Sequence, residues 1–85
     1  MNSKLEIFKK KLIYRAGYRG TKEMDILLSS FVNKYINTLD KELLVELEKF
    51  LNFEDEIILS FYHHDIIKKD IDKNKISKIF KNYKP

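Results

Sequence analysis

The sequence predicts an all-α fold: a small bundle of five helices that forms a single domain over residues 1–85. The first observation behind this prediction is that apolar residues recur with the 3.6-residue period of an amphipathic helix throughout the chain. The second is that no stretch of useful length alternates polar and apolar residues as a half-buried strand does. The third is that only short polar turns separate the apolar runs, and neither a repeat nor a low-complexity linker marks a second domain.

The first two helices are predicted from their caps and apolar stripes. The first follows Ser3, which forms a capping-box pattern with Glu6, and it ends at or near Gly17. The second begins around Thr21, whose hydroxyl can cap the exposed amides of the first turn, and it fades near residues 37–40. The residues of the two buried stripes are Leu5, Phe8, Leu12 and Ala16, followed by Met24, Leu27, Leu28, Phe31 and Tyr35.

The remaining three helices follow the same rules. The third starts about Asp40 and carries Glu42 and Glu46 on its exposed side. Asn52 is the predicted cap of a short fourth helix, which ends near the two histidines at 63 and 64. The buried residues of the third, fourth and last helices are Leu43, Leu44, Leu47, Phe50 and Leu51, then Ile57, Ile58 and Phe61, and finally Ile76, Ile79, Phe80 and Tyr83.

The composition favours a binding protein over an enzyme. A chain of 85 residues buries a small core and leaves little room for an enclosed active site. There is no cysteine, which excludes disulfides and thiolate metal sites, and the adjacent His63 and His64 lack the spacing that converges on a metal. No nucleophile pattern or dinucleotide-binding loop is present. We therefore predict no catalytic, metal-binding or cofactor-binding residue.

The distribution of apolar residues also bears on location. Residues 1–14 are amphipathic and charged rather than continuously apolar, and no later stretch is long enough to span a bilayer. We therefore expect a cytoplasmic protein without membrane insertion.

Positive charge is concentrated near the N-terminus. Residues 9–11 are three lysines, and Arg15, Arg19 and Lys22 follow within a chain of net charge +4. Such a patch could bind phosphates, so a basic helical module that binds nucleic acid or ribosomes is the alternative function. Against it, no helix-turn-helix or stacking platform is recognisable, and lysines on the solvated side of an amphipathic helix are common. The lysines from 68 to 84 are interpreted in the same way, as a solvated face.

The stretch from Tyr14 to Asp25, YRAGYRGTKEMD, holds both glycines of the chain. A glycine between two helices can take a positive φ and let another surface approach the backbone closely. Arg19 offers a planar fork for carboxylate or carbonyl oxygens, and Glu23 lies in the first turn of the next helix. Two interpretations remain open from the residues alone: a corner that docks a protein, or a simple connection in which Arg19 pairs internally with Glu23 or Asp25.

Residues 19–23 read Arg-Gly-Thr-Lys-Glu, and this Arg-Gly-x-x-Glu pattern resembles the signature of the succinate dehydrogenase FAD assembly factor family. The flanks are similar to the family as well: LIYRAGYRG precedes the pattern, EMDILLSSF continues it, and LEKFLNFEDEIIL takes the place of the family's third and fourth helices. The chain differs at Tyr18, where many members have a basic residue or histidine, and at Gly17, where many have a larger side chain. The resemblance covers most of the chain and implies a five-helix fold.

The resemblance implies a chaperone-like helper that is not an enzyme. Such a helper binds the flavoprotein subunit of succinate dehydrogenase, or of the related fumarate reductase, and assists covalent attachment of FAD to that subunit. It needs no cofactor of its own. We expect it to be monomeric when free and to bind no nucleic acid.

The resemblance also assigns partner-binding residues. Arg19 and Glu23 anchor the surface of the partner, and Gly20 permits its close approach. The residues that surround this contact are Tyr14, Arg15, Tyr18 and Asp25.

Overall fold

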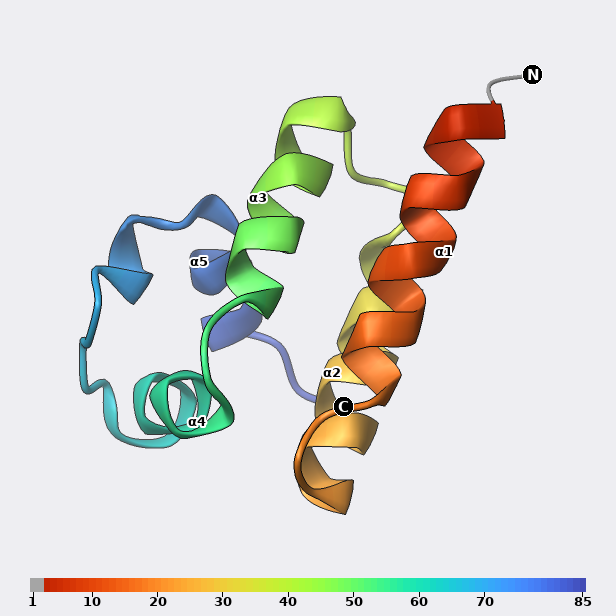
Figure 1. The fold of residues 1–85 in the computed structure, drawn as a ribbon. Coiled ribbons are helices and arrows are strands. Elements are labelled where there is room, and N and C mark those ends of the chain that lie inside the picture. Colours follow the sequence, from red (N-terminus) through yellow and green to blue (C-terminus); the bar gives the residue numbers. More distant parts are fainter. Residues whose placement is uncertain (1–2) are drawn as a thin grey trace.

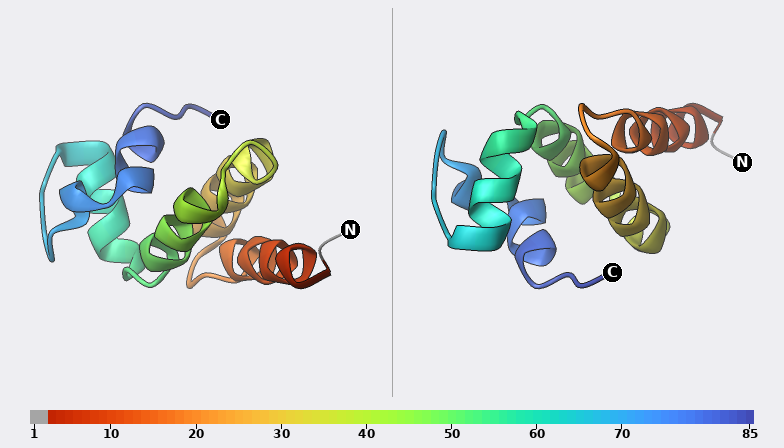
Figure 2. Two further views of the ribbon diagram at one scale, coloured as in Figure 1. Left: turned by 90° about the horizontal axis from the view of Figure 1, so that it is seen from above. Right: turned by 90° about the horizontal axis from the view of Figure 1, so that it is seen from below.

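The structure is a computed structural model that describes residues 3–85, and within this range it contains five α-helices, one short 3-10 helix and no strand. The predicted all-α, five-helix fold is therefore confirmed. The elements are α1 (Ser3–Gly17), α2 (Lys22–Tyr35), α3 (Lys41–Leu51), α4 (Asp55–His64), η1 (Ile71–Lys73) and α5 (Lys75–Lys81). Helices α1 and α2 pack side by side, and α3 lies between α1 and the group formed by α4, η1 and α5 (Figures 1 and 2), whereas α2 contacts α5 directly through Phe31 and Phe80.

Side-chain caps define most helix starts. The hydroxyl of Thr21 accepts a hydrogen bond from the amide of Met24 at 3.3 Å, as predicted. Asp40, the predicted start of the third helix, caps that helix by accepting from the amide of Leu43 at 2.9 Å. Asn74, which the sequence did not suggest as a cap, accepts from two amides of α5 at 2.8 and 3.1 Å. Helix α1 ends at Gly17. The predicted capping box depends on the side chain of Ser3, which lies outside the described part of the chain.

Two predictions about α3 and α4 are wrong. Asn52 is not the cap of the fourth helix: it follows the last turn of α3, and α4 begins later, after Glu54. Glu46 is not on an exposed face either, because its side chain is only 17% exposed. The start of α5 covers it, so that Glu46 Oε1 accepts from the amide of Lys75 at 3.2 Å and its backbone carbonyl accepts from Asn74 at 2.9 Å.

The core is built around aromatic rings from three helices. Phe31 of α2, Phe50 of α3 and Phe80 of α5 are almost completely buried. The ring of Phe80 lies 5.0 Å from that of Phe31 and 5.2 Å from that of Phe50, in the edge-on or tilted orientations that aromatic pairs favour. The predicted apolar stripes are all buried or half-buried. One core residue, Val32, was missing from the predicted stripe of α2.

The chain after α5 is also part of the core. Tyr83 lies beyond the last helix, yet it is only 6% exposed. Its hydroxyl donates to Ser30 Oγ of α2 at 2.9 Å, and its backbone carbonyl accepts from the hydroxyl of Tyr62 of α4 at 2.6 Å. The end of the chain thus joins α2 to α4.

The interpretation of the C-terminal lysines as a solvated face is wrong for Lys81. Its ammonium group donates to the backbone carbonyls of Phe61 and Tyr62 at 2.8 and 3.0 Å, and it pairs with Asp65 at 2.6 Å. These carbonyls belong to the last turn of α4, where few backbone amides remain to bond them, although Phe61 also accepts from the amide of Asp65. Lys81 therefore caps α4 from another helix. Over residues 3–85, every helix is too short or too polar to cross a membrane.

Candidate protein-docking site

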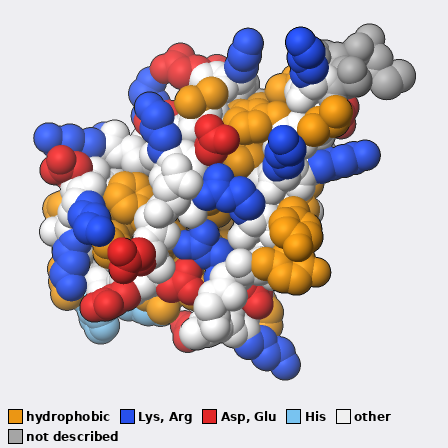
Figure 3. Space-filling view, in the orientation of Figure 1, with side chains coloured by type: hydrophobic (Ala, Val, Ile, Leu, Met, Phe, Trp, Pro, Cys, Tyr) orange, Lys and Arg blue, Asp and Glu red, His pale blue; other side chains and the backbone are white. Residues whose placement is uncertain are grey.

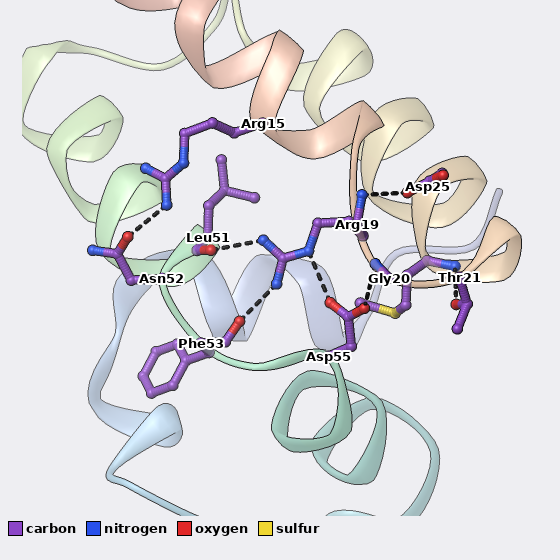
Figure 4. A network of polar contacts seen from close by, with 10 residues as sticks. Arg15, Arg19, Gly20, Thr21, Asp25, Leu51, Asn52, Phe53 and Asp55 are labelled. Carbon is purple, nitrogen blue, oxygen red and sulfur yellow. Dashed lines mark hydrogen bonds and ion pairs between the residues drawn. The ribbon is translucent and has the colours of Figure 1, made fainter.

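The Arg-Gly-x-x-Glu residues lie where α1 connects to α2, and the side chain of Arg19 turns inward (Figure 4). Its Nε donates to Asp55 Oδ1 at 2.8 Å. Its two terminal nitrogens donate to the backbone carbonyls of Leu51 at 2.7 Å and Phe53 at 2.6 Å. The side chain is only 11% exposed. Most of its hydrogen-bonding capacity is therefore used within the chain.

The three acceptors of Arg19 belong to one junction, the turn between α3 and α4. Leu51 ends α3, where backbone carbonyls have no helical partner, and Phe53 lies in the turn that follows. Asp55 is in the first turn of α4, a position where the helix dipole favours a negative charge. The planar guanidinium group satisfies all three acceptors at once and joins the α1–α2 connection to the α3–α4 turn.

Gly20 makes close contact with the same carboxylate. Its amide donates to Asp55 Oδ2 at 3.0 Å, and a Cβ atom added to Gly20 would lie 3.1 Å from that oxygen. The suggested positive φ is wrong, because neither glycine of the chain has one. The carboxylate that comes close to the backbone of Gly20 is therefore that of Asp55 in the same chain, and the contact does not require an external partner.

Two further predicted site residues also have partners within the chain. Asp25 accepts a hydrogen bond from the backbone amide of Arg19, and Arg15 donates to the side chain of Asn52 (Figure 4). We refer to Arg19, Gly20, Asp25 and Asp55 together as the Arg19 clamp. The interpretation in which Arg19 bonds to acidic residues of the same chain is thus correct, but the partners differ in part from those predicted. Its partner is Asp55 for the side chain and Asp25 for the amide, and Glu23 is not involved.

The other predicted site residues project into solvent. The side chain of Glu23 is 66% exposed, with Oε1 3.5 Å from His63 Nε2. Tyr14 and Tyr18 are 63% and 72% exposed, and their rings stack on each other with centroids 4.4 Å apart. These three residues are therefore available to a partner.

An apolar groove borders Glu23. It has a volume of about 400 Å³ and lies between α2, α4 and the end of the described chain. Ile26, one helical turn after Glu23, is 57% exposed there. The residues that line the groove are Glu23, Ile26, Leu27, Tyr62, His63 and Pro85. An exposed carboxylate at the rim of an apolar groove is suited to a partner that offers an apolar side chain beside a hydrogen-bond donor.

Sequence reasoning missed Asp55 and the groove. The available signal for Asp55 was indirect: a half-buried arginine needs an acidic partner, and residues 54–56 are all acidic. Nothing in the sequence distinguishes Asp55 from its two neighbours. The partner-binding role of the seven predicted residues remains a prediction. Over residues 3–85, no group of three or more histidine, aspartate or glutamate residues is arranged to hold a metal ion.

Comparison with known proteins gives a family match. Residues 10–84 match the family described as "Flavinator of succinate dehydrogenase". A relative from Scheffersomyces stipitis, named succinate dehydrogenase assembly factor 2, mitochondrial, is 37% identical over 81 residues, which cover 91% of this chain and 52% of that protein. A relative from Drosophila mojavensis, assembly factor 2-A, mitochondrial, is 40% identical over 48 residues, covering 56% of this chain and 31% of that protein.

The chain spans about half, or less, of the length of these curated relatives. A third relative, succinate dehydrogenase assembly factor 2, mitochondrial, from Aspergillus flavus, is 40% identical over 45 residues, which cover 53% of this chain and 15% of that protein. No solved structure matches the chain.

Proposed function

This chain belongs to the family of flavinators of succinate dehydrogenase, and from that premise we propose that it is an assembly factor for that enzyme. In this proposal it binds the flavoprotein subunit of succinate dehydrogenase, or of fumarate reductase, and promotes covalent attachment of FAD. The names of the relatives, all succinate dehydrogenase assembly factors, support the general role. The Arg-Gly-x-x-Glu pattern at residues 19–23 supports the finer one.

The observation that carries the proposal is that the motif combines two residues bonded within the chain with a glutamate that extends into solvent. Arg19 and Gly20 are held by Asp55, whereas Glu23 extends into solvent at the rim of an apolar groove. A motif that only connected two helices would not require a solvent-exposed glutamate at its last position, residue 23. We therefore assign partner contact to Glu23, Tyr14 and Tyr18.

The residues of the Arg19 clamp have a supporting role in this proposal. Its hydrogen bonds hold the α1–α2 connection, so that the exposed side chains meet the partner with little loss of conformational freedom. Arg15, which bonds to Asn52, supports the same junction from α1.

The mechanism requires binding energy and no catalytic residue in this chain. Covalent flavin attachment joins the flavin to a histidine of the flavoprotein, and the reacting groups must be held in a productive orientation. A helper that binds preferentially to that arrangement shifts the partner's population toward it. The helper itself then needs no cofactor, and we expect the purified chain to be colourless and inactive toward succinate.

The location of the protein is a separate question. The names of the relatives place those proteins in mitochondria, so they do not support the cytoplasmic location that we predicted from the sequence. That location stays a prediction.

Co-expression with the flavoprotein subunit tests the proposal. The measurement is covalent flavin fluorescence of the subunit after denaturing electrophoresis, with and without this chain. We expect Glu23→Gln to reduce the signal strongly, because an exposed carboxylate that contacts a partner is lost. Glu56→Gln, at another exposed glutamate (79% exposed), is the matched control and should leave the signal unchanged.

Co-purification from the native cell tests the alternative function. Recovery of the flavoprotein subunit supports the proposal. Recovery of RNA or ribosomes without that subunit would contradict it and favour the basic nucleic-acid-binding module.

A further inference from the structure

The outward face of α1 carries a row of exposed side chains, of which only the two tyrosines belong to the proposed docking site. Positions 7, 10, 11 and 14 fall on one side of α1, opposite its buried stripe, and Tyr18, just beyond the end of the helix, stacks its ring on that of Tyr14. Ile7 is 54% exposed, although it is a large apolar residue. We refer to Ile7, Lys10, Lys11, Tyr14 and Tyr18 as the outer stripe of α1. Lys10 and Lys11 are both exposed.

The net positive charge of the protein comes from α1. Of the 17 basic and 13 acidic side chains of the chain, α1 holds five and one. Its formal charge of +4 therefore equals that of the whole protein, and the rest of the chain is balanced with 12 side chains of each sign. Figure 3 shows Lys and Arg side chains beside hydrophobic ones along the side of the molecule where α1 runs.

The lysines of the outer stripe also differ from several lysines of the C-terminal half, which lie beside acidic side chains. Lys68 and Lys69 lie 3.9 and 3.6 Å from glutamate oxygens, and Lys81 is paired with an aspartate. Within residues 3–85, no ion pair or hydrogen bond is formed by the ammonium group of Lys10 or Lys11. Their charge is therefore uncompensated by the protein itself.

Lys9 differs from its two neighbours in sequence. Its side chain is 16% exposed and its Nζ lies 3.4 Å from Asn37 Oδ1, so the interpretation of residues 9–11 as one solvated face is wrong at this position. Only Lys10 and Lys11 belong to the outward face.

We propose that the outer stripe of α1 is a second docking surface, which receives an acidic segment of the flavoprotein subunit that carries an apolar or aromatic side chain. This inference rests on the proposed function. The carboxylates of the segment would pair with Lys10 and Lys11, and its apolar side chain would lie on Ile7 and Tyr14. A shallow hollow of about 370 Å³, lined by Ile7, Lys10, Lys11, Tyr14 and Arg15, provides the place for that side chain.

The position of the stripe favours the same partner as the motif. Tyr18 ends the stripe and immediately precedes Arg19 and Gly20 in the chain. A single partner surface that contacts Glu23 can therefore continue along Tyr18 and Tyr14 toward Ile7. Aromatic residues flanked by charges are also the composition that carries binding energy at protein interfaces.

The stripe is less suited to phosphates. Binding to a nucleic acid or an anionic membrane draws on many cations with little apolar contact, and here two unpaired lysines flank three exposed apolar or aromatic residues. Shape and charge together fit an acidic, partly apolar protein segment better.

Charge reversal in two places tests the proposal. The test variant is Lys10→Glu with Lys11→Glu, and the matched control is Lys73→Glu with Lys78→Glu, which changes the net charge equally at exposed sites away from α1. Titration calorimetry measures Kd for the FAD-free flavoprotein subunit at low and moderate salt, and circular dichroism confirms that each variant is folded.

We expect the α1 variant to have a Kd about tenfold higher at low salt and to lose the salt dependence of the native protein. The control should change Kd by less than about twofold. Ile7→Ser should weaken binding by a smaller factor at both salt concentrations.

The possible failures are distinguishable. If the native protein binds the subunit and the α1 variant binds as tightly as the control, the second docking surface is refuted and the proposed function stands. If the native protein does not bind the subunit at all, both fail. Loss of binding to RNA or to vesicles with anionic lipid in the α1 variant, with unchanged binding to the flavoprotein, would assign the stripe to phosphates and overturn the inference.

Discussion

Arg19 and Glu23 belong to the same five-residue motif, yet their surroundings are opposite. The guanidinium of Arg19 is nearly buried and bonds to a carboxylate and two carbonyls, whereas Glu23 is two-thirds exposed. Removing a half-buried charged group leaves its partners unsatisfied, but removing an exposed one mainly deletes whatever contact it makes outside. Substitutions at the two ends of the motif should therefore fail for different reasons.

We predict that Arg19→Ala lowers the free energy of unfolding by about 2–4 kcal/mol, because Asp55 and the two carbonyls lose their donor. For a domain of this size that corresponds to a fall in Tm of about 10 °C or more. Glu23→Ala should change stability by less than about 0.5 kcal/mol and should reduce only binding to the flavoprotein. Thermal unfolding followed by circular dichroism distinguishes them, and an Arg19→Ala variant as stable as the native protein would contradict the clamp.

Gly20 gives a second prediction at the same scale. A valine there would push on Asp55 Oδ2, which the Gly20 amide and Arg19 hold in place, so we expect Gly20→Val to destabilise the monomer by about 1–3 kcal/mol. Gly17→Ala is the control, because an added Cβ would meet only Ser29 Oγ at 3.9 Å, an ordinary contact. It should leave stability unchanged or raise it. A Gly20→Val protein with native Tm and weakened binding would instead place the close approach at the partner interface.

At the scale of the elements, the C-terminus of α4 depends on a side chain from α5. The backbone carbonyls of Phe61 and Tyr62 accept hydrogen bonds from Lys81, whose charge also suits the negative end of the helix dipole. We predict that Lys81→Met, which keeps most of the side chain, destabilises the protein by about 1–2 kcal/mol.

Native-state hydrogen exchange locates this effect. The amides of Asp65 and Ile66, which bond to the last turn of α4, should exchange faster in Lys81→Met. Lys78→Met, an exposed position on the same helix, should leave their exchange unchanged. Equal exchange in both variants would show that α4 ends without help from α5.

At the scale of the whole molecule, the end of the chain closes the core. Tyr83 packs its ring 5.2 Å from that of Phe31, donates to Ser30 and accepts from Tyr62, so it connects three parts of the fold. In a protein of 85 residues the total stability is only about 5–10 kcal/mol, and one buried aromatic ring is a large share of it.

We therefore predict that Tyr83→Ala lowers the free energy of unfolding by about 3 kcal/mol or more, whereas Tyr83→Phe costs only about 1 kcal/mol, for the hydroxyl's bond to Ser30. Urea denaturation measures both, and an unchanged m-value would show that the fold itself persists. Lys84→Ala, at the next residue, is exposed and serves as the control. If Tyr83→Ala unfolded at the native urea midpoint, the last residues would not belong to the core.

The sequence by itself determined the helices, most of their ends and the apolar stripes. These features depend on residues within one or two turns of each other: the 3.6-residue period, the caps Thr21 and Asp40, and Gly17 at the end of α1. The motif at residues 19–23 was also recognisable as a local pattern. Local interactions of this kind are the same whichever way the helices are later packed.

Only the tertiary structure decided which side chains of the motif turn inward. Arg19 and Asp55 are 36 residues apart, and they meet because the α3–α4 turn packs beside the α1–α2 connection. The same reason explains the errors at Glu46 and Lys81. Glu46 bonds to residues at the start of α5 that are 28 and 29 positions away, and Lys81 bonds to carbonyls of α4 that are 19 and 20 positions away. Exposure and ion pairing between distant segments follow from how the helices are packed, and helical period and caps contain no information about that arrangement.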